Sequence, residues 1–190
     1  EAARLLAARR PLLDFLSIRY VIAGYPLDEA IFPKVASTAV GSGAIPIMIY
    51  ENPNVRPLVS FADRVTFLPA GEDDIFRRFE ESGFSAILAD CKDSCVPGER
   101  QFESGTARIV SQRNGKFTFD VDATGPTFLV IAENNFPGWE ATIDGQATSI
   151  RTVNTVYIGL EVPAGEHRVE LRYRYPCPPW KILACLRGAL

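Results

Sequence analysis

The chain has 190 residues, of which 47% are hydrophobic and 23% are charged, and this is enough for one globular domain with an ordinary core. Its formal net charge is -3, with 20 Lys and Arg residues among 23 Asp and Glu residues, so it offers no basic surface for the phosphate backbone of a nucleic acid. A single His excludes catalysis that requires two histidines, and 14 Gly and 14 Pro are typical of strands separated by turns.

The first half of the chain mixes helices with strands. The pattern predicts a helix in two pieces over residues 1–16, broken at Pro11, and then a strand over residues 18–22. Residues 26–44 have few periodic apolar positions and are interpreted as a loop that holds at most one short strand. A helix of about three turns is predicted between residues 72 and 83, and the other predicted strands are 47–51, 58–61, 65–68 and 84–89.

The second half alternates apolar and polar residues with a period of two, as half-buried strands do. Asn114-Gly115 and Asp144-Gly145 are expected to close tight hairpins with positive φ angles. Residues 128–132 are apolar on both faces and should form a central strand. We therefore predict a mainly β protein with some α structure, in which an α+β amino-terminal portion precedes an antiparallel β-sandwich or jelly roll.

The predicted organisation has three parts. Residues 1–104 form the α+β portion packed on the sandwich, residues 105–176 form the sandwich strands, and the two together make one compact domain. Residues 177–190 are interpreted as the start of a truncated membrane helix or as a tail, because Trp180 and Lys181 are aromatic and basic anchors before an apolar stretch. The chain begins with Glu1 and shows no signal peptide, so we expect it to be a piece of a longer protein.

Cys91 and Cys95 form the most specific local pattern, with three residues between them. A zinc site needs four ligands, and His167 and the distant Cys177 and Cys185 are the only further candidates, so we expect no metal and no cofactor. A redox motif normally has two intervening residues. A disulfide in an oxidising compartment is the favoured interpretation, and closing so short a loop contributes about 2 kcal/mol.

The sequence does not reveal catalytic machinery. His167 at the start of a strand has no Ser or Cys placed beside it, so a solvated histidine is favoured over a general base. Asp120, Asp122 and Asp144 fall on the polar faces of predicted strands, and solvated carboxylates are favoured over a glycosidase pair. We therefore predict that this fragment is not an enzyme.

The loop from Asn134 to Trp139 admits two interpretations. Its two amides, Asn134 and Asn135, and the indole of Trp139 offer hydrogen bonds and a stacking surface for a sugar. Alternatively, Pro137-Gly138 makes the turn and Trp139 plugs the core between the two sheets. The plug is the favoured interpretation.

Several stretches, in this order and spacing, resemble the carboxy-terminal extracytoplasmic region of YfhO-like bacterial membrane proteins. They are residues 12–22, 49–52 with Arg56-Pro57, 135–139 running into 143–145, and 162–167 followed by a Tyr-Pro exit. The resemblance implies a multi-pass protein related to the C superfamily of glycosyltransferases, which use polyprenyl-phosphate sugars outside the cytoplasm. It also implies a catalytic acid near amino-terminal membrane helices, which are absent from this sequence. It assigns no role to Cys177 or Cys185.

These observations lead to one functional hypothesis and a rival. The fragment is expected to be a non-catalytic, extracytoplasmic, membrane-adjacent domain whose partners are the rest of its own membrane-embedded chain and a glycan or lipid-linked sugar. The candidate binding residues are Asn134, Asn135, Trp139, Glu51 and Asn52. The rival is a structural or partner-docking sandwich with no ligand site. A third reading, a self-contained hydrolase, requires a cleft with two acids at catalytic separation.

Overall fold

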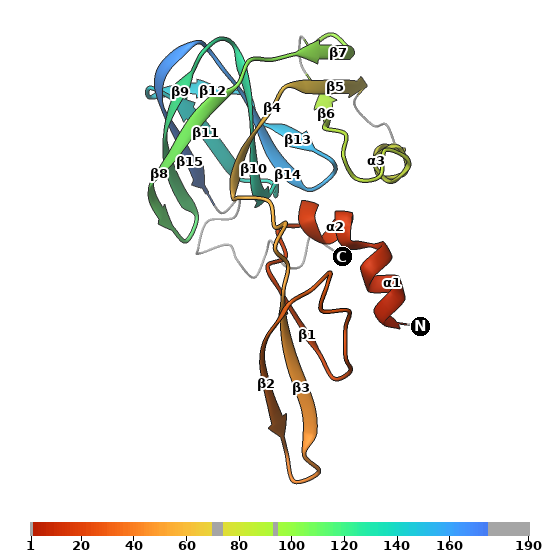
Figure 1. Cartoon of the computed structure of the whole chain (residues 1–190). Coiled ribbons are helices and arrows are strands. Elements are labelled where there is room, and N and C mark those ends of the chain that lie inside the picture. The colour runs from red at the N-terminus through yellow and green to blue at the C-terminus, as the bar shows by residue number, and fades with distance from the viewer. Residues whose placement is uncertain (1, 70–73, 93–94, 175–190) are drawn as a thin grey trace, which may run out of the picture. The chain divides into compact units, whose positions relative to one another are not determined.

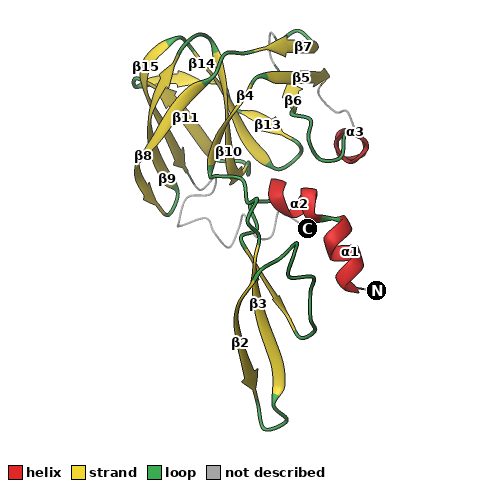
Figure 2. Ribbon diagram, in the orientation of Figure 1, coloured by secondary structure: helices red, strands yellow, loops and turns green. Residues whose placement is uncertain are grey.

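The computed structural model describes residues 2–69, 74–92 and 95–174, which form two compact units. The first unit contains Glu1–Leu58 and Asp73–Ala86, and the second contains Val59–Glu72 and Ile87–Leu190. Figure 1 labels the elements along the chain, and Figure 2 distinguishes helices from strands. The predicted boundary at Trp180 lies outside the described residues.

The first unit combines three helices with a three-stranded antiparallel sheet of order β1-β3-β2. Pro11 lies in the first turn of the second helix, where its missing N–H costs no hydrogen bond, and this separates the first two helices as predicted. One core cluster surrounds Tyr50, whose hydroxyl accepts a hydrogen bond from the Leu27 N–H at 3.0 Å. The elements are α1 (Ala2–Ala8), α2 (Arg10–Phe15), α3 (Ile75–Glu81), β1 (Tyr20–Ala23), β2 (Lys34–Val40) and β3 (Ile45–Glu51).

Strand β2 is longer and more regular than the sequence indicated. Residues 26–44 were expected to be a loop with at most one short strand, whereas Lys34–Val40 is a seven-residue strand paired with β3. All seven of its residues are exposed. A strand that buries neither face has no need for alternating apolar residues, so the period-two pattern is missing here.

The second unit holds two sheets. The seven-stranded sheet has the order β4-β10-β14-β13-β6-β5-β7, and its strands pair antiparallel except for the parallel pair β5 and β6. Four of these strands precede residue 105 in the chain and nevertheless join strands that follow it. The elements are β4 (Val59–Ala62), β5 (Arg64–Pro69), β6 (Leu88–Cys91), β7 (Gly98–Gln101), β10 (Thr127–Asn134), β13 (Arg151–Val153) and β14 (Tyr157–Val162).

The five-stranded sheet is antiparallel with the order β12-β11-β15-β9-β8. Phe117, Phe119 and Val121 on β9 and Val169 and Leu171 on β15 are buried, so one face of this sheet meets the core. The predicted sandwich of antiparallel sheets is confirmed. The elements are β8 (Gly105–Arg113), β9 (Lys116–Ala123), β11 (Trp139–Ile143), β12 (Gln146–Thr148) and β15 (Gly165–Tyr173).

Two local predictions need correction. The strand predicted at residues 84–89 covers Leu88–Cys91 instead, and Phe84, with a φ of 61°, does not adopt an extended conformation. The Asn114-Gly115 turn has a positive φ only at Gly115, whereas Asp144 and Gly145 both have positive φ angles. Only the second turn therefore has the pair of left-handed residues that a type I′ hairpin requires.

Candidate functional site

The sequence-predicted site residues fall in both units, and Asn52 proves to be part of the interior of the first. Its side chain is fully buried. The Nδ2 atom donates to Asp14 Oδ1 at 2.8 Å and to the Ile18 carbonyl at 3.1 Å, and Oδ1 accepts from the Asn54 N–H at 3.2 Å. These bonds join Asn52 to the Asp14 side chain and to the backbone at Ile18 and Asn54, so they tie three segments of the first unit together.

Glu51 ends β3 and is half-buried. Its carboxylate pairs with Arg19, whose Nε lies 3.4 Å from Glu51 Oε1. Arg19 is itself exposed, so this pair is a surface ion pair that contributes little to stability.

Trp139 begins β11 in the second unit and has features of both predicted roles. Its ring lies 5.8 Å from the ring of Phe117 and 5.3 Å from that of Tyr173, measured between centroids. Its Nε1–H donates to the Asn134 carbonyl at 3.0 Å. The ring remains half-buried, so Trp139 packs at the margin of the core and still presents part of its surface.

That surface lines a pocket of about 510 Å³. Strand β10 contributes Glu133, the end of β8 and the β8–β9 turn contribute amides and a guanidinium, and β11 contributes the indole. This combination of an aromatic ring with acceptors and donors can stack on a sugar ring and hydrogen-bond its hydroxyls. The lining residues are Gln112, Arg113, Asn114, Gly115, Phe117, Glu133 and Trp139.

Asn134 and Asn135 line a different pocket, of about 270 Å³, together with Phe136, Thr155 and Val156. The Nδ2 of Asn135 donates to Thr152 Oγ1 at 3.0 Å, and its backbone N–H donates to the Val156 carbonyl at 2.7 Å. Asn134 and Asn135 are therefore close to Trp139 in the sequence, but their side chains do not line the Trp139 pocket.

Sequence reasoning missed a charged pocket of about 690 Å³ on the outer face of the five-stranded sheet. Strand β15 pairs with β9 so that Arg168 lies opposite Asp120, and the guanidinium donates to that carboxylate at 2.7 and 3.0 Å. Arg108 also bonds to Asp120. The hydrogen bond from Arg168 is the main cause that lowers the pKa of Asp120 below its usual value. The alternation of apolar and polar residues predicted that Asp120 and Arg168 face outward. Which side chains then meet depends on the register between β9 and β15.

His167 lies at the margin of the same pocket with hydrogen-bond acceptors at both ring nitrogens. Nδ1 lies 2.7 Å from Asp144 Oδ2, and Nε2 lies 3.2 Å from the Ala164 carbonyl. A carbonyl and a carboxylate can only accept, so these contacts favour the doubly protonated ring. The bond to Asp144 raises the pKa of His167 above its usual 6.5, while burial acts in the opposite direction.

Stability is therefore expected to fall as the pH rises through the pKa of His167. Because the folded-state pKa lies above the unfolded one, the pair stabilises fully below about pH 6.5 and loses its effect above the folded-state pKa. An NMR titration can follow this ring without ambiguity, since the chain has one His. Asp144→Asn should return the pKa towards 6.5 and flatten the stability profile above neutrality. A wild-type pKa at or below 6.5 contradicts the prediction.

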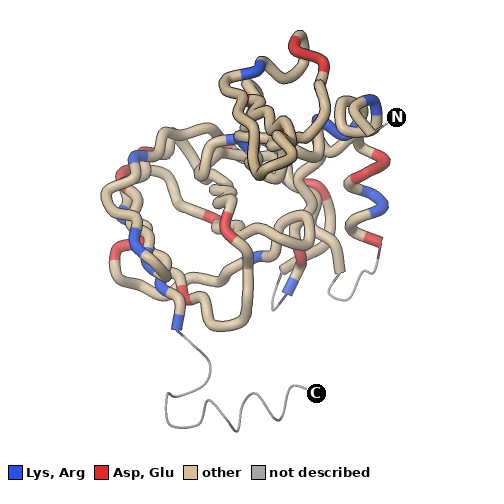
Figure 3. The backbone as a smooth tube through the Cα atoms, turned by 90° about the horizontal axis from the view of Figure 1, so that it is seen from below, with Lys and Arg blue, Asp and Glu red and all other residues tan. Residues whose placement is uncertain are grey.

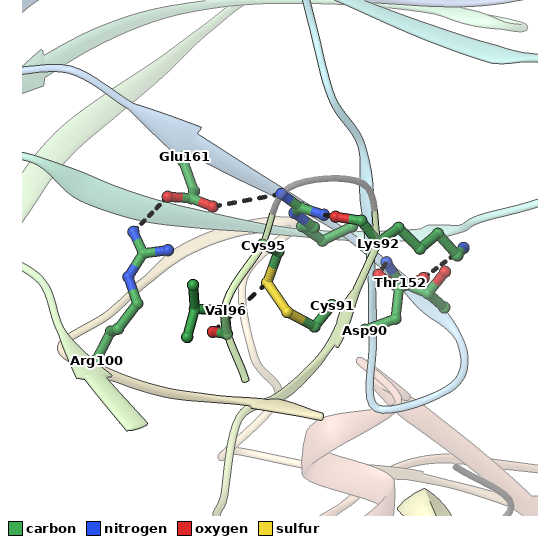
Figure 4. Close-up of a disulfide and its surroundings, with 9 residues drawn as sticks. Asp90, Cys91, Lys92, Cys95, Val96, Arg100, Thr152 and Glu161 are labelled. Atoms are coloured by element: carbon green, nitrogen blue, oxygen red, sulfur yellow. Dashed lines mark hydrogen bonds and ion pairs between the residues drawn. A yellow bond between two sulfur atoms is a disulfide. The ribbon is translucent and has the colours of Figure 1, made fainter. Parts of the chain in front are cut away.

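Cys91 and Cys95 are joined by a disulfide (Figure 4). Beside it, the Lys92 carbonyl accepts a hydrogen bond from Arg151 Nη1 at 2.9 Å, and Asp90 Oδ1 accepts one from the Thr152 N–H at 2.7 Å. The disulfide thus closes a loop that is bonded to β13.

Two further properties concern the residues that the structure describes. Among them, no group of three or more His, Cys, Asp or Glu side chains is arranged to hold a metal ion. None of the described helices has both the length and the apolar character needed to cross a bilayer. Basic and acidic positions are interspersed along the described backbone (Figure 3).

Comparison with known proteins identifies one relationship. Residues 100–180 match the model of a family described as bacterial membrane protein YfhO. Within the described residues, this range runs from the end of β7 to the end of β15 and contains the whole five-stranded sheet. No curated protein and no solved structure matches the chain. The resemblance inferred from the sequence is confirmed for this range, and the chain contains a YfhO-like region that gives it the context of a bacterial membrane protein.

Proposed function

We propose that the second unit is an extracytoplasmic domain of a membrane protein that recognises a glycan in the pocket beside Trp139. The observation that carries this proposal is the composition of that pocket, in which an indole lies with Glu133 and with the polar β8–β9 turn. Carbohydrate sites need an aromatic surface for the apolar face of a sugar and directed polar groups for its hydroxyls.

The disulfide supports the extracytoplasmic side. Disulfides persist in oxidising compartments and are rare in the cytosol. The Cys91–Cys95 bond lies in the same unit as the YfhO-like region. In this proposal the domain binds and positions a cell-envelope glycan or a lipid-linked sugar, and the chemistry belongs to another part of a glycosyltransferase-like protein.

The binding test is an NMR titration of the full chain with peptidoglycan fragments and a panel of bacterial hexoses. We expect chemical-shift changes at the residues lining the Trp139 pocket and a loss of affinity of about ten-fold or more for Trp139→Ala. Because Trp139 also packs on Phe117, the isosteric variant Glu133→Gln is measured beside it and should weaken binding without lowering stability. Phe136→Ala, which removes an exposed ring outside this pocket, serves as the control.

The rival function is a structural or partner-docking sandwich. The internal hydrogen bonds of the Trp139 indole and the Asn135 amide favour it, because they occupy the one N–H of the indole and one of the two N–H groups of the amide. If no glycan of the panel shifts the pocket residues, or if Glu133→Gln binds as well as the wild type, recognition at this pocket is wrong and the docking role takes its place.

A further inference from the structure

The outer part of the β2–β3 hairpin has no charged side chain. Residues 35–50 contain no Asp, Glu, Lys or Arg, although 23% of the chain is charged. Residues 33–46 are all exposed. Burial in a core therefore does not explain why this stretch lacks charged side chains. Figure 2 shows the hairpin as an extended two-stranded ribbon.

Three large apolar side chains lie on this ribbon in contact with solvent. Val35 is 50% exposed, Val40 51% and Ile45 63%. Strand β1 pairs with β3 only from Met48 to Glu51, so the outer end of the ribbon consists of β2 and β3 alone. Val35 is next to Lys34, whereas Val40 and Ile45 flank the turn and are several residues from any charged side chain in the chain. An exposed apolar surface on an uncharged segment is typical of a site that another apolar surface or medium covers.

The distribution of these residues favours a surrounding medium over a single protein partner. Strand β2 is an edge strand and, after Lys34, has none of the Lys or Pro residues that usually protect such an edge. A second copy of the chain that paired with this edge would cover β2. It would leave the equally uncharged turn at residues 41–44 and the exposed Ile45 and Pro46 of β3 in water.

Charge and aromatic residues return at the opposite end of the hairpin. Lys34 Nζ lies 2.7 Å from Glu29 Oε1, and Glu51 pairs with Arg19. Tyr20 is 53% exposed and lies opposite Glu51 in the β1–β3 register. Lys34 pairs with Tyr50 and Tyr20 pairs with Glu51, so charged and aromatic side chains begin together where the uncharged stretch ends. Tyrosine and basic side chains beside an apolar, uncharged segment are typical of a membrane interface.

We propose that the tip of the β2–β3 hairpin, residues 35–47, inserts into the interfacial layer of a lipid bilayer. Residues 100–180 of the same chain match a family of membrane proteins. A lipid bilayer is therefore an apolar medium that would be close to this hairpin. The unpaired backbone groups along the outer edge of β2 require water, so insertion stops at the interface and does not reach the hydrocarbon core. This inference is independent of the glycan pocket.

The first test is flotation of the full chain with phosphatidylcholine vesicles, with and without phosphatidylglycerol. The variant Val35→Thr/Val40→Thr/Ile45→Thr keeps β-branched side chains and should lower the partition coefficient by about ten-fold or more. A matched control makes the same three chemical changes at exposed positions of the second unit, Val96→Thr/Val110→Thr/Ile109→Thr, and should bind like the wild type. Equal binding of the two triple variants overturns the proposal.

The second test reports insertion at the tip directly. An environment-sensitive fluorophore is attached at Ser42→Cys, or at Asn114→Cys in the β8–β9 turn, with Cys177 and Cys185 replaced by Ser. Vesicles should shift the emission to shorter wavelength at residue 42 and leave it unchanged at residue 114. An unchanged spectrum at residue 42 overturns the proposal. So does a lipid-free dimer that the hairpin triple variant abolishes, because a second copy then covers the tip.

Discussion

Phe128→Ala is expected to lower the free energy of unfolding of the second unit by about 3–5 kcal/mol, which is a large part of the stability of a typical domain. The ring is fully buried in β10, with its centroid 5.9 Å from that of Phe67 and 5.4 Å from that of Phe102. It also fills the space beside Gly159, where an added Cβ would lie 2.6 Å from Phe128 Cζ. Removing it therefore leaves a cavity that the surrounding strands cannot easily close.

Phe136→Ala is the matched control for this measurement. Phe136 is 60% exposed, so its loss should change the free energy of unfolding by no more than about 0.5 kcal/mol. Urea unfolding of both variants, followed through a probe in the second unit, gives the comparison. Equal stability of the two variants contradicts the place of Phe128 in the core of the second unit.

Asn52→Asp is expected to cost the first unit about 3 kcal/mol or more, although the two side chains have nearly the same shape. The substitution removes the donor that bonds to Asp14 and to the Ile18 carbonyl and places a carboxylate against another carboxylate. Hydrogen exchange of the β1 and β3 amides should accelerate strongly. A ligand-binding role alone predicts no such change.

Asn54→Asp makes the same chemical change two residues away, at an exposed side chain. It should leave the exchange rates of β1 and β3 close to those of the wild type. If Asn52→Asp is equally tolerated, Asn52 does not have the structural role that the hydrogen bonds indicate and returns as a binding candidate.

The candidate site was only partly accessible to sequence reasoning. The loop that ends at Trp139 was recognised as a feature because an aromatic and two amides stand next to a turn. Its pocket also needs Glu133 from β10 and Asn114 from the β8–β9 turn, and these come together only when the two sheets are packed. Asn52 was proposed as a binding residue, and its sequence position gives no sign that its amide bonds to Asp14.

Strands β12 and β13 were not predicted, and the membrane-protein resemblance depended on the order of several distant stretches. Local patterns alone determined the other strands of the second half, the break at Pro11 and the positions of the two turns. Each of these depends on residues close in the chain, such as the alternation in β9 or the Asp144-Gly145 pair. Only the tertiary structure decided that β4 to β7 join β10, β13 and β14, that Arg168 meets Asp120, and that the β2–β3 ribbon remains uncovered. Strand order and register depend on contacts between segments that are distant in the sequence. The apolar–polar period of a single strand gives no information on the free energy of those contacts.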